Sequence, residues 1–204
     1  MFGAASEKTM KTTKLFLLPL ILTCSVAARA ATLTVTVRAA NGLPARDAVV
    51  YAVPEGKDIP LVRGAAVMDQ KNRMFVPHVL AIQVGTAVSF PNNDDIQHQV
   101  YSFSSAKSFQ LPLYKGTPGQ RITFDKPGVV ALGCNIHDNM TAFIVVVDTP
   151  YFDKSSASGT AELQDLHTGT YSVHLWYADL GGELLPRSIT LSENDHERLN
   201  LVIP

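Results

Sequence analysis

The sequence predicts an all-β protein built as a β-sandwich. Apolar and polar residues alternate with a period of two over residues 33–37, 87–90 and 171–176, which is typical of strands with one buried face. Turn-forming residues follow these segments at short intervals, as at Asn41-Gly42, Gly85 and Pro127-Gly128. No long segment carries an apolar stripe with the 3.6-residue period of a helix. Short strands joined by regular turns favour a sandwich.

The expected strands can be placed in order along the chain. Residues 33–51 are expected to form a strand, a turn at Asn41-Gly42 and a second strand. From Met74 onward we expect a strand, a turn at Gly85, another strand, and later two strands flanking Cys134. The second of these is the β-branched run 141–147. Residues 102–119 are polar and weakly patterned, so a loop is expected there. Residues 159–204 are expected to add several more strands.

The first 30 residues have the pattern of a secretory signal peptide. Basic residues precede the mostly apolar segment 15–28, and Ala28-Arg29-Ala30 fits the small-x-small cleavage pattern. We therefore expect cleavage after Ala30 and export, into the periplasm if the source is a Gram-negative bacterium. Cys24 would be removed with this segment. Acylation of Cys24 in a lipoprotein is a weaker alternative, because Thr23 is a poor residue before a lipidated cysteine.

The charge and hydropathy of the remaining chain exclude two kinds of partner. The first 30 residues hold four of the 17 basic and one of the 18 acidic residues, which leaves a net charge of −4 for residues 31–204. No basic footprint for nucleic acid is present in this balance. No apolar segment after residue 30 is long enough to span a bilayer. We expect the mature protein neither to bind nucleic acid nor to cross a membrane.

Four residues in the middle of the chain offer metal-binding side chains. Cys134, His137 and Met140 lie within seven residues, and His98 lies 36 residues before Cys134. Cys134 is the only cysteine after residue 30, and an unpaired cysteine in an exported protein is a dimerising thiol, a reactive thiol or a metal ligand. Two histidines and one cysteine with a weak axial methionine are the ligands of a mononuclear blue-copper (type 1) site. The sequence therefore predicts one copper ion.

Other interpretations of these residues stay open. A buried, inert thiol would explain Cys134, and Met140 could simply fill a gap in a core. Zinc accepts the same thiolate and imidazole donors, although a thioether is a poor ligand for it. Asp94-Asp95 could bind a metal or lie in a polar loop. Asn92-Asn93 could hold the loops around the site by hydrogen bonds, or could only form a turn.

The central region resembles the cupredoxins, the small blue-copper proteins of the amicyanin and plastocyanin type, and among them it is most similar to amicyanin. The resemblance is carried by Val88-x-Phe90-x-Asn92-x-Asp94 with His98, and by Phe124-x3-Gly128 followed by Cys134-x2-His137-x2-Met140. It implies a Greek-key β-sandwich in which His98, Cys134, His137 and Met140 bind one type 1 copper ion. Two positions depart from the amicyanin-like pattern. Asp138 replaces a proline after the second histidine, and Gly133 suggests a looser entry into the loop.

The resemblance implies an exported one-electron carrier between protein partners, not an enzyme, with transient docking near His137. The chain with its flanks also resembles proteins catalogued as methylamine utilisation proteins. Two other functions stay open: a periplasmic copper carrier or buffer without an electron-transfer role, and a copper-free β-sandwich binding module. No hydrolase signature accompanies Cys134, since a cysteine nucleophile also needs a base placed by the fold and oxyanion donors.

The flanks resemble the two halves of a transthyretin-like β-domain. Asn41-Gly42-Leu43-Pro44 is similar to its first hairpin turn, and residues 159–173 are similar to its later strands. The expected organisation is a signal peptide at 1–30, N-terminal flanking strands at 31–73, a cupredoxin domain at 74–148 and C-terminal flanking strands at 149–204. We expect the flanks to form one small second domain into which the cupredoxin is inserted, because domain termini often lie close together.

Overall fold

The computed structural model describes residues 1, 3, 30–56, 62–180 and 182–204, so the expected signal peptide lies almost entirely outside the described residues. In the described ranges no helix has the length and apolar character needed to cross a bilayer. The described chain is all-β, as predicted, apart from one short 3-10 turn, Ala178–Leu180. Its strands are β1 (Ala31–Ala39), β2 (Val49–Pro54), β3 (Ala65–Val67), β4 (Asp69–Lys71), β5 (Met74–Val76), β6 (Val79–Gln83), β7 (Thr86–Ser89), β8 (His98–Phe103), β9 (Ser108–Tyr114), β10 (Ile122–Phe124), β11 (Gly128–Gly133), β12 (Thr141–Val147), β13 (Phe152–Lys154), β14 (Thr160–Leu166), β15 (Gly169–Tyr177), β16 (Gly182–Glu183), β17 (Arg187–Leu191) and β18 (His196–Ile203).

Two sheets in the middle of the chain pack around one apolar core. The larger sheet has the strand order β6-β12-β11-β8-β9, and the smaller one has the order β10-β7-β3. The chain passes from one sheet to the other between β6 and β7, between β7 and β8, between β9 and β10 and between β10 and β11, as in a Greek-key sandwich. Phe90, Phe124 and Ile144 are completely buried between the sheets. The predicted sandwich is therefore confirmed for the central strands.

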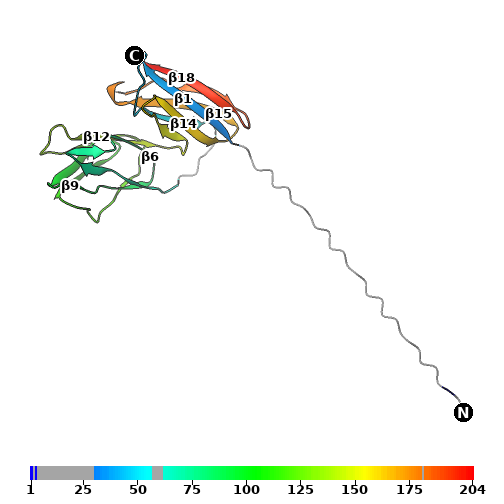
Figure 1. Ribbon diagram of the computed structural model, residues 1–204, viewed down its shortest axis with the longest axis horizontal. Helices are drawn as coiled ribbons and strands as arrows, with labels where there is room; N and C mark the ends of the chain where they lie inside the picture. Colours follow the sequence, from blue (N-terminus) through cyan, green and yellow to red (C-terminus); the bar gives the residue numbers. More distant parts are fainter. Residues whose placement is uncertain (2, 4–29, 57–61, 181) are drawn as a thin grey trace.

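Strands from the two ends of the chain pair with each other and form a second sandwich. In one sheet β1 is antiparallel to β14 and parallel to β18, and in the other β2 pairs with β13 and β15. Leu33, Leu163 and Leu175 lie in the core between these sheets. The labelled strands β1, β14, β15 and β18 form one body in Figure 1, and β6, β9 and β12 form the other.

An apolar interface joins the two sandwiches. Trp176 of β15 is only 4% exposed and packs on Phe143 of β12, with ring centroids 5.2 Å apart. Four buried valines from β2, β6 and β12 belong to the same cluster. Nζ of Lys154 donates to the backbone oxygen of Val79 at 3.0 Å and forms a 2.8 Å ion pair with Asp47. The flanking sandwich thus covers part of the outer face of the five-stranded sheet.

Two local expectations differ from the structure. Residues 102–119, expected as a loop, contain the edge strand β9, which pairs with β8. Pro112 lies inside β9, which an edge strand tolerates because one row of its backbone groups makes no ladder hydrogen bonds. The second difference concerns the start of the central strands. Because β3 pairs with β7 and Met68 is buried in the central core, these strands begin at Ala65 instead of Met74.

Candidate metal centre

Strand register brings the candidate ligands together from two connections of the central sandwich. Strands β11 and β12 stay paired up to Gly133 opposite Thr141, so residues 134–140 close the end of this hairpin. Cys134 directly follows β11, and Met140 directly precedes β12. His98 is the first residue of β8, which neighbours β11 in the same sheet. The ends of the three strands therefore place a thiol and two imidazoles in one region.

Three of the four predicted ligand residues form one tight cluster. The ligand atoms of His98, Cys134 and His137 all lie within 4.8 Å of one another. The Nδ1 atoms of the two histidines are 3.2 Å apart, and Sγ of Cys134 lies 3.9 Å from Nδ1 of His137. His98 is completely buried, Cys134 is 4% exposed, and His137 is partly exposed.

These separations are the size that one bound metal ion requires. Two nitrogens at about 2.0–2.1 Å from an ion, the distance found at zinc, lie roughly 3.3 Å apart at a tetrahedral angle. A sulfur at about 2.3 Å from the same ion would lie roughly 3.5–3.6 Å from either nitrogen. The observed Nδ1–Nδ1 distance of 3.2 Å is close to the first value, and the observed Sγ–Nδ1 distance of 3.9 Å is somewhat longer than the second. The donor set of two imidazoles and one thiol thus suits a first-row transition metal, with a small inward shift of the thiol.

A carboxylate fixes the orientation of the buried histidine. Nε2 of His98 lies 2.6 Å from Oδ2 of Asp94, and the Asp94 side chain is itself only 10% exposed. A carboxylate accepts the Nε2 proton, which leaves Nδ1 as the free lone pair that faces His137. A metal-binding histidine commonly donates its second ring nitrogen to a carboxylate in this way, which also raises its basicity as a ligand.

Asp94 is held in turn by the hairpin between β4 and β5. Its carboxylate accepts hydrogen bonds from the backbone nitrogens of Asn72 (2.5 Å) and Arg73 (2.8 Å), both of which have a positive φ. Burial raises the pKa of Asp94, but the hydrogen bonds from Arg73, His98 and Asn72 outweigh it, so this pKa lies below its usual value. Asp94 therefore remains ionised and accepts hydrogen bonds at neutral pH.

Asn92 holds the loop that carries Asp94. It is 2% exposed, and its Nδ2 donates to the backbone oxygens of Ile96 (2.9 Å) and Tyr114 (2.8 Å). Its Oδ1 accepts from the backbone nitrogen of Asp94 at 3.0 Å. The loop-holding role proposed for Asn92 is thus observed. Asn93 instead donates to Asp69 on the surface, at 2.8 Å.

The position of Met140 agrees with the predicted loop. Its side chain is 1% exposed and lies in the central core with Phe90 and Phe124. Its backbone nitrogen donates to the oxygen of His137 at 2.9 Å, and the nitrogen of His137 donates to Cys134 at 3.4 Å. These turns fold the loop tightly between the strands. A core role and an axial-ligand role both place Met140 here, and its ligation stays a prediction.

The most important residue that sequence reasoning undervalued is Asp94. Its i, i+4 spacing to His98 was visible, but the pattern equally suits a polar loop. The decisive contacts come from Asn72 and Arg73, more than 20 residues away, which no local pattern reveals. Asp95, the second carboxylate of the pair, is exposed and lies outside the described cluster of His98, Cys134 and His137.

Comparisons with known proteins return solved structures that resemble part of this chain. A copper-containing nitrite reductase from Thermus scotoductus SA-01 is 28% identical over 47% of this chain, with a TM-score of 0.38, and the match covers 25% of the reductase. A purple cupredoxin from Nitrosopumilus maritimus is 23% identical over 41% of this chain and 99% of its own, with a TM-score of 0.36. An oxidised amicyanin variant is 22% identical over 48% of this chain and 99% of its own, with a TM-score of 0.37. No family model matches the sequence, and no curated protein sequence matches it.

Proposed function

We propose that the central sandwich is a cupredoxin-type domain that carries single electrons between protein partners. One type 1 copper ion would be held by His98, Cys134 and His137, with Met140 as a weak axial ligand. Copper bound by such ligands alternates between Cu(II) and Cu(I), because thiolate and thioether suit Cu(I) while imidazole suits both states. The thioether of Met140 also favours copper over zinc at this position.

The observation that carries this proposal is the arrangement of three donor atoms within 4.8 Å of one another. Asp94 adds independent support, because it orients His98 so that Nδ1 faces the other donors. A histidine that only filled a core would not require this orientation. The lone thiol of Cys134 points to the same centre without a disulfide partner among the described residues. Each feature alone has a structural explanation, whereas all three in one place favour a metal site.

Burial of the donors favours an electron carrier over a copper-delivery protein. His98 and Cys134 are enclosed, and the ligand loop is closed by paired strands, so an ion held there would exchange slowly. His137 alone reaches the surface, beside Ile136, which is 50% exposed. We propose that redox partners dock transiently on the surface around His137, where a small apolar contact suits a short-lived encounter.

Export and domain organisation complete the proposal. Residues 1–30 would direct the chain to the periplasm, where electron carriers of this class meet their partners. The flanking strands would form one domain into which the central strands are inserted, which the pairing of β1 with β14 and of β2 with β15 supports. We also propose that the chain is of the type catalogued as methylamine utilisation proteins, a name that does not identify its redox partner.

Two measurements on the copper-loaded protein test this function against copper delivery. Protein-film voltammetry is expected to show a reversible one-electron couple that is lost in Cys134→Ala. Incubation of the reduced protein with a strong Cu(I) chelator is expected to remove copper only slowly. Rapid loss of copper to the chelator, with a sluggish or absent couple, would contradict the electron-carrier function and support a copper carrier.

A further inference from the structure

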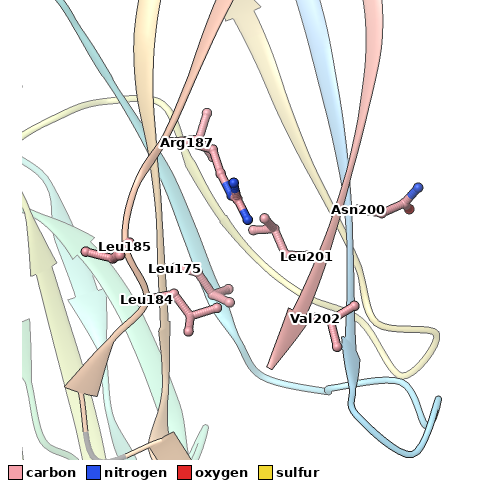
Figure 2. Close-up of a pocket in the computed structure, with 8 residues that line it drawn as sticks. Leu175, Leu184, Leu185, Arg187, Asn200, Leu201 and Val202 are labelled. Carbon is pink, nitrogen blue, oxygen red and sulfur yellow. The ribbon is translucent and has the colours of Figure 1, made fainter. Parts of the chain in front are cut away.

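A cavity in the flanking sandwich shares no residue with the candidate metal centre. Its volume is about 380 Å³, and it opens between β17 and β18, which are edge strands of the two facing sheets. Figure 2 shows the side chains around it, among them Leu175, Leu184, Leu201 and Arg187. Leu185, Val173, Val202 and the polar Asn200 complete the wall. The cavity is thus a mainly aliphatic slot lined also by one cationic side chain and one amide side chain.

Arg187 occupies a position where the strand pattern calls for an apolar residue. Side chains at i, i+2 and i+4 of a strand lie on one face. Leu191 lies in the core of the flanking sandwich and Ile189 packs against it, so Arg187 starts from the same face of β17, although its side chain is exposed where this face reaches the mouth of the cavity. The opposite wall is formed by Leu201 of β18, which is 7% exposed. Arg187 thus places a charge at the mouth of this core, at a position where the alternating pattern of β17 would have an apolar side chain.

The guanidinium of Arg187 is turned toward the slot. In Figure 2 its nitrogen atoms point toward Leu201, above Leu175 and Leu184, and not away from the strands. The ion pairs found among the described residues do not include Arg187. Its fork of donors faces the opening, and a carboxylate placed there would match that fork with two parallel hydrogen bonds.

We propose that this cavity binds a single-chain aliphatic carboxylate. The alkyl chain would lie against the leucines, and the carboxylate would pair with Arg187 at the opening. The volume lies within the range of about 300–1,000 Å³ that small-molecule sites have, and an apolar wall with one oriented polar group is their usual composition. Leu185 is 89% exposed at the rim, an apolar surface that such a chain would cover.

A different explanation for Arg187 exists and is separable by experiment. Inward-pointing charges at sheet edges prevent edge-to-edge association of strands. That role predicts that removal of the charge increases self-association and leaves ligand affinity unchanged. The carboxylate site predicts the reverse: weaker binding of an anionic ligand with no change in the oligomeric state.

Isothermal titration calorimetry with decanoate, below its micelle concentration, tests the proposal. The protein is expected to bind one equivalent. Arg187→Gln is expected to weaken decanoate binding at least tenfold and to leave binding of decanol unchanged, because only the carboxylate uses the guanidinium. Leu185→Asn, a change at an exposed position, is expected to weaken both ligands several-fold. Arg121→Gln, at an exposed arginine of the central sandwich, is the matched control and is expected to change neither.

Three results would overturn the proposal. One is the absence of saturable decanoate binding by a protein whose circular dichroism shows that it is folded. Another is equal affinity of Arg187→Gln and the unchanged protein for decanoate. The third is a dimer, measured by light scattering at the concentration used, that decanoate does not change. This dimer would dissociate when Arg187 or Leu185 is replaced. That result would assign the slot to a second copy of the chain.

Discussion

The ring of Tyr101 lies directly against Gly133, the residue before Cys134. A Cβ atom at Gly133 would come within 2.6 Å of Cζ and 2.7 Å of Oη of Tyr101, closer than any real Cβ contact. The two residues are partners in the pairing of β8 with β11, and these strands deliver His98 and Cys134 respectively. Instead of loosening the loop entry, the glycine lets the tyrosine ring close over the backbone beside the thiol.

Gly133→Ala is therefore expected to destabilise the protein. The new methyl group must push Tyr101 or the backbone of β11 aside, and overpacking of this kind costs about 1–3 kcal/mol. Urea unfolding of the metal-free protein measures this free energy. Gly119→Ala is the control, because nothing lies within 4 Å of its Cβ position. Adding Tyr101→Ala to Gly133→Ala is expected to recover part of the loss, and strict additivity of the two changes would contradict the contact.

Asp94→Ala is expected to weaken copper binding by about 10- to 100-fold, the usual effect when the carboxylate behind a histidine ligand is removed. Without Asp94 the ring of His98 loses the partner that fixes its tautomer, and the backbone nitrogens of Asn72 and Arg73 lose their acceptor. Competition with a chelator of known affinity measures the change. Asp95→Ala, at the neighbouring exposed carboxylate, is expected to bind copper normally, and equal effects of the two variants would refute a specific role for Asp94.

Trp176→Ala is expected to reduce stability by about 3–5 kcal/mol, since it removes a buried ring from the interface between the sandwiches. Because this ring packs on Phe143 of β12, its loss is also expected to split a single thermal transition into two. Differential scanning calorimetry measures both effects. Phe103→Ala removes a ring that is 77% exposed and is expected to change stability by less than about 0.5 kcal/mol. A single unshifted transition for Trp176→Ala would show that the sandwiches do not stabilise each other.

Met140→Leu is expected to retain copper and to shift its reduction potential. Leucine nearly conserves the volume of methionine, so the core around Phe90 stays filled. The thioether is lost, however, and the axial ligand is one of the groups that tune the potential of a blue-copper site. Voltammetry of the variant measures the shift. An unchanged potential would place Met140 in the core alone and leave copper with three protein ligands.

The strands that dominate the two cores could be predicted from the sequence because burial imposes a regular pattern. The run predicted at residues 141–147 matches β12 at both ends, and the alternation at residues 33–37 lies within β1. Strand β9 escaped prediction for a physical reason: it is an edge strand with most side chains exposed and a proline inside it. Its pairing with β8, and not its own pattern, makes it a strand.

The donor residues of the candidate site could be predicted from the sequence, whereas the residues that hold the donors in place could not. Thiol, imidazole and thioether side chains can be recognised as metal donors from the sequence alone, and the prediction that the donors around Cys134 share one loop is confirmed. Asp94 and Tyr101 act through residues distant in sequence, Arg73 in one case and Gly133 in the other. Contacts of this kind depend on strand pairing, which a single sequence does not specify.

Visible spectroscopy during titration with Cu(II) tests the central claim most directly. The reduced, purified protein is expected to develop an intense blue or green thiolate-to-copper band that saturates at one equivalent, and Cys134→Ala is expected to show none. Such a band requires the sulfur of Cys134 to be bound to copper, whatever the partners of the protein are. If no band forms while Cys134 stays free and reacts with a thiol reagent, the electron-carrier proposal is contradicted, and the central sandwich is a copper-free binding module.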